Sequence, residues 1–397
     1  MIEKKKRFFA LFRAAAIVAS VFLSGGGVKA GAEILKRTDV TIKIEAMGKI
    51  FEFSYPEVDF SGGELYLKNA EEAAEEIYYS TLVFPVNASF ICFPERDYPF
   101  ELKNEKAGLG VDKREILRGI DEALKNEKHY FKVEKTVEVL PRVTTEYLKK
   151  TLVKRGEFST NYSSSQEKRK QNIALSGKLL SMTEIANGEE FSFNGVVGER
   201  TEERGFSSAK VIENGKFTEG VGGGVCQVSS TVYNCALLSG MTVTERHRHS
   251  LAVSYVEPSF DAMVSFSYAD LRFLNESGES VYLVVDADGS RVRARIYGVE
   301  NIYRYKRISV VNELIDPLPE EIVYTDELFL GEKKQMVYPK KGLKSAGALE
   351  KYSGEKLIER KLLGTDEYSA LRGITLVGKS APERRGDFVA FCLAGCF

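Results

Sequence analysis

The N-terminal third of the chain alternates between runs with the two-residue period of β-strands and runs with the period of an α-helix. Apolar and polar residues alternate over 41–45 and again over 51–55, which predicts two strands. An Ala- and Glu-rich run begins after Asn69, a residue type that favours helix N-termini, and extends to about Ser80. The opening pattern is therefore strand, strand, helix.

A second helix and a longer alternating segment follow. Asp112 is expected to cap a helix that extends to about Lys125 and places its apolar residues on one face. The alternation over 130–140 predicts one half-buried strand. Together these elements predict a small α+β domain over residues 33–155.

The pattern changes near the middle of the chain, where three glycines precede a long helical run. The glycines at 222–224 come directly before the helix that contains Cys226, and apolar residues then recur with helical spacing. We expect Gly240 to end this helix and residues 241–246 to form a strand. This segment lies within a mixed α/β domain predicted over 156–298.

The last part of the chain has the pattern of β-structure. Short alternating runs separated by turn residues fill the segment 315–379, which predicts a mostly β module. Residues 380–397 are expected to form a tail. The whole pattern predicts a multidomain α+β protein.

The composition agrees with several folded domains. A chain of 397 residues is too long for one ordinary domain, and its 43% hydrophobic and 28% charged residues are typical of a folded protein. The 56 Lys and Arg residues balance the 57 Asp and Glu residues, and no basic stripe is interleaved with aromatic residues. Nucleic-acid binding is therefore not predicted.

The first thirty residues have the features of an export signal. Basic residues at 4–7 precede an apolar run over 14–23, and residues 28–30 offer a cleavage site. The alternative is an uncleaved anchor, because 8–28 is long enough to span a bilayer. In both cases we expect the rest of the chain to be extracytoplasmic: secreted, associated with the cell wall, or held at the membrane by residues 1–30.

Export permits disulfides, but the five cysteines are odd in number and irregularly spaced. Cys226 and Cys235 lie on the same expected helix and point to opposite faces, so they cannot bridge each other. Cys392 and Cys396 are close enough in sequence to pair in the tail. Buried thiols are expected for Cys92 and Cys235.

Cys226 has the position of a reactive thiol. At the start of a helix, unpaired backbone N–H groups and the positive end of the helix dipole lower the pKa of a thiol. The following strand leads to His247 and His249, whose alternate spacing places both on one face if the strand continues. Cysteine proteases and transglutaminase-like enzymes use such a thiol and imidazole, with a carboxylate that orients the imidazole. Asp261 and Asp270 are the candidates for that carboxylate.

These residues belong to a series of motifs that resembles the VanW family, over about 140 residues from Phe158 to Gly298. The matching segments, in chain order, are Phe191-Ser192-Phe193-Asn194, Val197-Gly198-Glu199-Arg200-Thr201, Gly220 through Thr231, Glu245-Arg246-His247-Arg248-His249-Ser250, Tyr255-Val256, Asp261-Ala262 and Asp270-Leu271-Arg272-Phe273. Arg248 stands where the family has a proline. The resemblance implies an association with the cell wall and with vancomycin resistance.

Shorter resemblances flank this segment. Residues 108–117 and the strand that leads into 141–144 are similar to a peptidoglycan-binding module that often precedes VanW segments. The segments 328–332, 341–342 and 373–379 are similar to a G5 domain. These resemblances imply binding to wall peptides or glycans, and the alternative for each is a spacer.

Several uses of the central site fit these residues. In the first, Cys226 is a nucleophile, His249 is its base and Asp261 or Asp270 orients the imidazole, giving acyl transfer or hydrolysis on a peptidoglycan peptide. In the second, the same region binds a wall fragment without turnover. In the third, Cys226, His247 and His249 ligate zinc, although no fourth ligand is identified. A structural buried cysteine is the remaining alternative.

Candidate substrate-binding residues surround the cysteine. They comprise a flexible glycine loop, polar side chains of the helix, one histidine and a guanidinium suited to carboxylates: Gly222, Gly223, Gly224, Gln227, Ser229, Ser230, His247 and Arg200. A surface ion pair with Glu199 is the alternative role for Arg200. We predict no cofactor and no resident metal. The expected partners are peptidoglycan or its peptide and glycan fragments.

Overall fold

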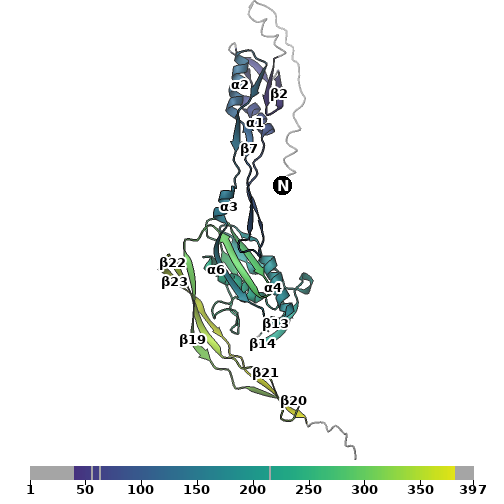
Figure 1. Cartoon of the computed structure of the whole chain (residues 1–397), viewed down its shortest axis with the longest axis vertical. Helices are drawn as coiled ribbons and strands as arrows, with labels where there is room; N and C mark the ends of the chain where they lie inside the picture. Colours follow the sequence, from purple (N-terminus) through teal and green to yellow (C-terminus); the bar gives the residue numbers. More distant parts are fainter. Residues whose placement is uncertain (1–39, 55–56, 62–63, 214–215, 381–397) are drawn as a thin grey trace, which may run out of the picture. The chain divides into compact units, whose positions relative to one another are not determined.

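The computed structural model describes residues 40–380 except 55–56, 62–63 and 214–215 (Figure 1). The predicted export segment, the tail after 380 and the cysteines in that tail lie outside the described residues. The described chain divides into two compact units, of which the first extends to Phe84 and resumes over Gly108–Val139. The second contains Pro85–Ala107 and the chain from Leu140 onward.

The first unit combines helices and strands. Its elements are β1 (Thr41–Ala46), β2 (Lys49–Ser54), β3 (Val58–Ser61), β4 (Glu64–Leu67), α1 (Ala70–Thr81), β7 (Gly108–Val111), α2 (Lys113–Lys125), β8 (Tyr130–Val133) and β9 (Thr136–Val139). Strands β2, β1 and β8 form one sheet in that order, and α1 and α2 pack against each other. Apolar side chains from the sheet and both helices share one core.

The sequence correctly predicted where both helices of this unit begin, but it predicted the capping contact of only one of them. The Asp112 side chain accepts a hydrogen bond of 3.0 Å from the Arg114 backbone N–H, as predicted for a cap. Asn69 also stands at a helix start, but it has a left-handed φ of 56° and its side chain makes no capping bond. The prediction of one strand over 130–140 is wrong, because β8 pairs with β1 whereas β9 pairs with β7.

The second unit contains most of the chain. Its helices are α3 (Thr145–Thr151), α4 (Glu167–Leu180), α5 (Phe193–Val197), η1 (Glu202–Arg204) and α6 (Val225–Leu238). Its strands up to residue 298 are β5 (Ser89–Cys92), β6 (Phe100–Lys103), β10 (Val153–Asn161), β11 (Thr183–Ile185), β12 (Glu190–Ser192), β13 (Ser208–Glu213), β14 (Lys216–Val221), β15 (Thr242–Glu245), β16 (Arg272–Leu274), β17 (Val281–Ala287) and β18 (Arg291–Gly298).

An antiparallel sheet with the order β10-β18-β17-β11 organises the centre of this unit. Helix α6 packs on β10 and β18, and α4 packs on β17 and against α6 (Figure 1). The side chains of Val225 and of every residue from Gln227 to Leu237 are buried, so α6 is the central element of the core. A helix that is buried along its whole length holds the residue at its start in a fixed place.

The C-terminal part is built from strands, as predicted for a mostly β module. It contains β19 (Arg304–Ile315), β20 (Glu321–Phe329), β21 (Lys333–Val337), β22 (Gly342–Ser353), β23 (Lys356–Tyr368) and β24 (Ile374–Ser380). These strands form two sheets with the orders β19-β22-β23 and β20-β24-β21. The predicted fold class, α+β with a mostly β C-terminal part, is therefore confirmed.

The first of these C-terminal sheets packs directly on the chain between β15 and β16. Ser345 Oγ lies 2.7 Å from Ser259 Oγ, and Ser309 Oγ donates a 2.7 Å hydrogen bond to the Pro258 carbonyl. The Ser369 backbone N–H donates to the Ser250 carbonyl at 2.8 Å. This sheet is thus part of the same compact unit as α6.

The three described cysteines test the prediction of buried thiols. Cys92, Cys226 and Cys235 are all free thiols, and burial raises the pKa of Cys92 to about 11 and that of Cys235 to about 12. Cys235 is fully buried as expected, whereas Cys92 is half-buried.

Among residues 40–380, apart from the three short gaps, no helix combines the length and apolar character needed to cross a bilayer.

Candidate functional site

The glycine loop before α6 sets the position of Cys226. Gly222 and Gly224 have φ values of 88° and 109°, in the left-handed region that favours glycine. A Cβ on Gly222 would lie 3.0 Å from the Arg200 Cβ, and one on Gly224 would lie 3.0 Å from Ile173. The loop therefore packs tightly on the protein itself, and it delivers Cys226 as the second residue of α6.

The Cys226 thiol meets the His249 imidazole within hydrogen-bonding reach. Cys226 is half-buried as a residue, and its sulfur also lies 3.5 Å from the Val264 carbonyl oxygen. His249 is 5% exposed, so the imidazole approaches the thiol from the protein interior. The structure thus brings together the two groups that the sequence placed on α6 and after the following strand.

Asp261 holds the imidazole from its other side. Its Oδ2 lies 2.6 Å from His249 Nδ1 and accepts a 2.7 Å hydrogen bond from the His249 backbone N–H. These contacts fix the ring and leave Nε2 for the thiol. Cys226, His249 and Asp261 therefore form a chain of thiol, imidazole and carboxylate, the order in which a base-activated nucleophile is built.

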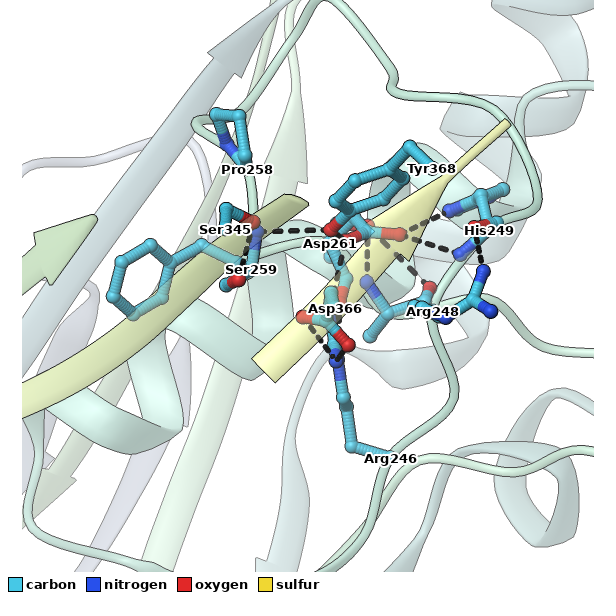
Figure 2. A network of polar contacts seen from close by, with 12 residues as sticks. Arg246, Arg248, His249, Pro258, Ser259, Asp261, Ser345, Asp366 and Tyr368 are labelled. Atoms are coloured by element: carbon cyan, nitrogen blue, oxygen red, sulfur yellow. Dashed lines mark hydrogen bonds and ion pairs between the residues drawn. The ribbon is translucent and has the colours of Figure 1, made fainter. Parts of the chain in front are cut away.

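The Asp261 carboxylate is itself surrounded by donors (Figure 2). Arg246 donates to Asp261 Oδ1 at 2.8 Å and to the Asp261 carbonyl at 2.7 Å, and the Tyr368 hydroxyl donates to Oδ1 at 2.5 Å. Asp366 pairs with Arg246 through both carboxylate oxygens at 2.7 and 2.8 Å. Asp261 and Tyr368 are each 1% exposed, so this network lies in the interior.

These contacts favour the ionised forms of the three groups. Burial alone would raise the pKa of Cys226, but the hydrogen bond and charge of His249, with Arg200 nearby, bring it below its usual value. Burial opposes the charge on His249, yet Asp261 and Cys226 raise its pKa to about 9. Asp261 is desolvated, but His249 and Arg246 lower its pKa to about 2. These shifts act in favour of a thiolate beside an imidazolium.

Arg200 supplies a further charge near the sulfur. Both terminal nitrogens of its guanidinium are buried and have no hydrogen-bond partner among the described residues, and the group lies 5.6 Å from the Phe193 ring centroid. Burial lowers the pKa of Arg200, and the charges of Cys226 and Asp270 act in the opposite direction. The alternative prediction of a surface ion pair with Glu199 is wrong, because these nitrogens are sealed from solvent.

Asp270, the other candidate for the orienting carboxylate, has a different set of partners. Its oxygens accept hydrogen bonds from Ser192 Oγ at 2.6 Å and from the Asn194 backbone N–H at 2.9 Å. Asn194 Nδ2 in turn donates to the carbonyls of Ser265 and Ala269 at 3.2 and 2.9 Å. The orienting role proposed for Asp270 is therefore not supported by the geometry. This carboxylate instead holds the start of α5, and the Asn194 side chain there binds the turn after Val264.

Three polar side chains of α6 that were expected to bind substrate face the protein interior. Gln227 Nε2 donates to the Asn161 carbonyl at 2.8 Å, and its Oε1 accepts from Arg169 at 3.0 Å. Ser229 Oγ donates to the Ala262 carbonyl at 2.6 Å, and Ser230 Oγ accepts from the Ala262 backbone N–H at 2.9 Å. Gln227 is 2% exposed and both serines are fully buried. They join α6 to the segment that contains Asp261 and are not placed to contact a substrate.

His247 does not share the position of His249. Strand β15 ends at Glu245, and His247 Nε2 lies 2.9 Å from Glu245 Oε1 with its side chain 41% exposed. The expectation that both imidazoles lie on one face required the strand to continue, and it does not. Within the described residues, no three His, Cys, Asp or Glu side chains are grouped so that they could hold a metal ion. The zinc alternative therefore lacks a ligand set in that part of the chain.

Four residues of the site received no role from the sequence. Arg246 and Tyr255 lie inside the motifs that resemble the VanW family. Burial and the charge of Cys226 raise the pKa of Tyr255, and a hydrogen bond with Ser230 opposes them. Asp366 and Tyr368 alternate with the exposed Glu367 on β23, a pattern that indicates two inward-facing polar residues on one strand. That alternation could have identified them as buried, but not as partners of Asp261.

Fold and site together define an α+β domain in which a thiol at a helix start is linked through an imidazole to a buried carboxylate. Residues 168–297 match the family described as VanW-like protein, so the central domain of this chain is VanW-like, as predicted.

Two curated proteins are related to the chain. The uncharacterized protein YoaR of Bacillus subtilis is 36% identical over 183 residues, which are 46% of this chain and 55% of that protein. The vancomycin B-type resistance protein VanW of Enterococcus faecalis is 27% identical over 138 residues, which are 33% of this chain and 50% of that protein. The chain thus spans about half the length of the curated relatives it matches.

Two solved G5 domains align with part of the chain. The G5 domain of an IgA1 protease is 18% identical, with 20% of this chain and 90% of that chain covered and a TM-score of 0.15. HP0197-G5 is 24% identical, with 20% of this chain and 100% of that chain covered and a TM-score of 0.12.

Proposed function

We propose that this chain is an exported cell-envelope protein that carries out acyl transfer or hydrolysis on a peptidoglycan peptide, with Cys226 as the nucleophile. The observation that supports this proposal is the chain of contacts from the Cys226 thiol through His249 to Asp261. The similarity to a vancomycin resistance protein supports the choice of the cell wall as the setting. The basic and apolar pattern of residues 1–30 supports export.

The proposed reaction uses each group in its favoured state. The Cys226 thiolate attacks the carbonyl carbon of a peptide bond, and a tetrahedral adduct forms. The His249 imidazolium gives its proton to the leaving amine as the carbon–nitrogen bond breaks, which leaves a thioester on Cys226. The neutral imidazole then takes a proton from an incoming amine or water, which attacks the thioester and releases the thiolate. Asp261 keeps the imidazole in place through both steps.

The ionisation of Cys226 gives a direct test. We expect iodoacetamide to alkylate Cys226 well below the pH at which ordinary thiols, with a pKa of about 8.5, react. Peptide mass spectrometry over about pH 5 to pH 9 would give the rate for each cysteine. Cys92 and Cys235 serve as internal controls, because burial raises their pKa to about 11 and about 12. A Cys226 profile with an ordinary midpoint would contradict the nucleophile assignment.

The same ion pair sets an upper pH limit for turnover. His249 has a raised pKa of about 9, so its proton is present below that pH and is lost as the pH rises through it. We therefore expect turnover to fall on the alkaline side near pH 9, although the thiolate persists, because the leaving amine loses its proton donor.

An alternative function is binding of a wall glycan without turnover, and one surface feature favours it. Phe266 is 53% exposed and Tyr268 is 71% exposed on the turn after Val264, whose carbonyl contacts the Cys226 sulfur. Large exposed aromatic side chains beside a functional group often mark an interaction surface. The turn is held by Asn194, so these rings lie on a fixed support.

Paired replacement of these aromatic residues tests that surface. Phe266→Ala with Tyr268→Ala should reduce the amount of protein that sediments with insoluble peptidoglycan, because both rings lose their exposed contact area. The matched control replaces two exposed apolar residues that lie outside the flanking modules, Ile302 at 76% and Leu314 at 60% exposure. Equal loss of binding in both double variants would show that this turn is not a specific surface.

A further inference from the structure

The carboxylate of the proposed triad is anchored by a strand far away in the sequence. Asp366 and Tyr368 are on β23, at the edge of the three-stranded sheet β19-β22-β23. Asp366 lies 120 residues after Arg246, and Tyr368 lies 107 residues after Asp261. Figure 2 shows both side chains directed at the Asp261 and Arg246 pair.

We propose that Asp366 and Tyr368 are positioning residues for the Cys226 site, so that the C-terminal sheet is a working part of the site and not a spacer. The inference rests on the proposed function, since it assigns how Asp261 is held in the active arrangement. It is carried by the contacts of two buried side chains with the triad carboxylate and its arginine.

The two residues act on Asp261 with opposite sign. The Tyr368 hydroxyl donates to Oδ1 and so takes part of the negative charge away from the imidazolium. Asp366 engages Arg246 through both oxygens and therefore offsets the positive charge that Arg246 presents to Asp261. Losing Asp366 should weaken the hold of Asp261 on the imidazolium, whereas losing the Tyr368 hydroxyl should strengthen it.

The charged and titratable groups around Asp261 are few and can be named. They come from α6, from the segment between β15 and β16, and from β23: Cys226, Tyr233, Arg246, His249, Tyr255, Asp366 and Tyr368. Tyr233 contacts Arg246 through its ring, with 5.8 Å between the guanidinium carbon and the ring centroid. Arg307 of β19 lies beside this set, with its guanidinium carbon 4.7 Å from the Phe260 ring centroid, and its charge acts to lower the pKa of Tyr233.

The test is the pH profile of Cys226 alkylation in full-length variants. Asp366→Asn should move the midpoint to higher pH and reduce the rate below the midpoint by up to about tenfold, the change expected for one unit of thiol pKa. Tyr368→Phe should move the midpoint to lower pH. Asp366→Glu, which keeps the charge, should restore most of the wild-type profile, and this rescue separates the charge from a folding defect.

Matched controls exist on the same sheet. Glu367→Gln changes an exposed carboxylate next to Asp366, and Tyr352→Phe removes a hydroxyl that donates to Glu350 at 2.6 Å on β22. Both controls should keep the wild-type profile. The inference is overturned if Asp366→Asn and Tyr368→Phe also keep it, or if both move the midpoint in the same direction, as a general loosening of the site would do.

Failure of this inference can be told apart from failure of the proposed function. If Asp261→Asn shifts the profile but neither β23 variant does, the role of Asp261 is supported, and the β23 contacts only hold the C-terminal sheet against the segment that contains Asp261. If the wild-type Cys226 titrates as an ordinary thiol and Asp261→Asn changes nothing, the proposed function itself is wrong.

Discussion

Replacing Cys226 with alanine should reduce turnover of peptidoglycan peptides by about three orders of magnitude or more, because the nucleophile of a covalent mechanism has no substitute. The fold should survive, because Cys226 is half-buried and alanine removes only the sulfur, whose contact with the Val264 carbonyl is long at 3.5 Å. Mass spectrometry of purified peptidoglycan incubated with each variant would measure the released or transferred products.

The control for this result is another half-buried thiol. Cys92→Ala removes a cysteine of the same unit that lies on β5 and has no contact with the triad, so turnover should stay at the wild-type level. Circular dichroism and thermal unfolding would show that both variants fold. Wild-type turnover in Cys226→Ala would exclude the covalent mechanism and favour the binding alternative.

Replacing Asp261 with asparagine should have the second largest effect, a fall in turnover of about 10²–10⁴-fold. The amide cannot balance the charge of the imidazolium or fix the ring in the tautomer that leaves Nε2 for the thiol. Stability should also fall, by up to about 3–5 kcal/mol, because Arg246 and Tyr368 then donate to a group without charge in a buried place. Denaturant unfolding and peptide turnover measure the two effects separately.

Asp286→Asn is the matched control for Asp261→Asn. Asp286 pairs with the fully buried Arg295 at 2.8 Å on the central sheet and has no contact with the triad. It should lower stability while turnover at a temperature below unfolding is retained. Equal loss of turnover in both variants would show that the effect of Asp261→Asn comes from weakened folding.

The pH dependence of stability should report Asp261 as well. Its pKa of about 2 lies below the unfolded value, so the stabilisation is complete above that unfolded value and is lost as the pH falls toward about 2.

Local sequence signals were sufficient for the thiol and for its imidazole. The helical spacing after three glycines predicted that Cys226 lies at the start of α6. Only a few residues separate α6 from β15, and His249 follows β15 closely in the sequence, so His249 was expected near the helix. The choice between Asp261 and Asp270 could not be made from the sequence, because both follow the histidines in strand-like contexts. It depends on which carboxylate turns toward the imidazole, and tertiary contacts decide that.

The errors in the substrate-binding prediction have a common physical cause. Ser229 and Ser230 lie one turn after Cys226, so helical geometry places them near the same face as the thiol. That face is covered by the segment around Ala262, which takes both hydroxyls as hydrogen-bond partners. Within α6 only Cys226 and Leu238 are partly exposed, and the sequence pattern did not reveal which segment covers the other residues.

The anchoring of Asp261 by β23 also orders the events of protein synthesis. A growing chain contains the thiol, the imidazole and the carboxylate once residue 261 has been added, but it must gain more than a hundred further residues before the Asp366 carboxylate exists. Until then Asp366 does not offset the positive charge that Arg246 presents to Asp261, so on the proposed role of Asp366 the carboxylate holds the imidazolium less strongly. The proposed arrangement is therefore complete only after β23 has been synthesised and has packed against the segment that contains Asp261.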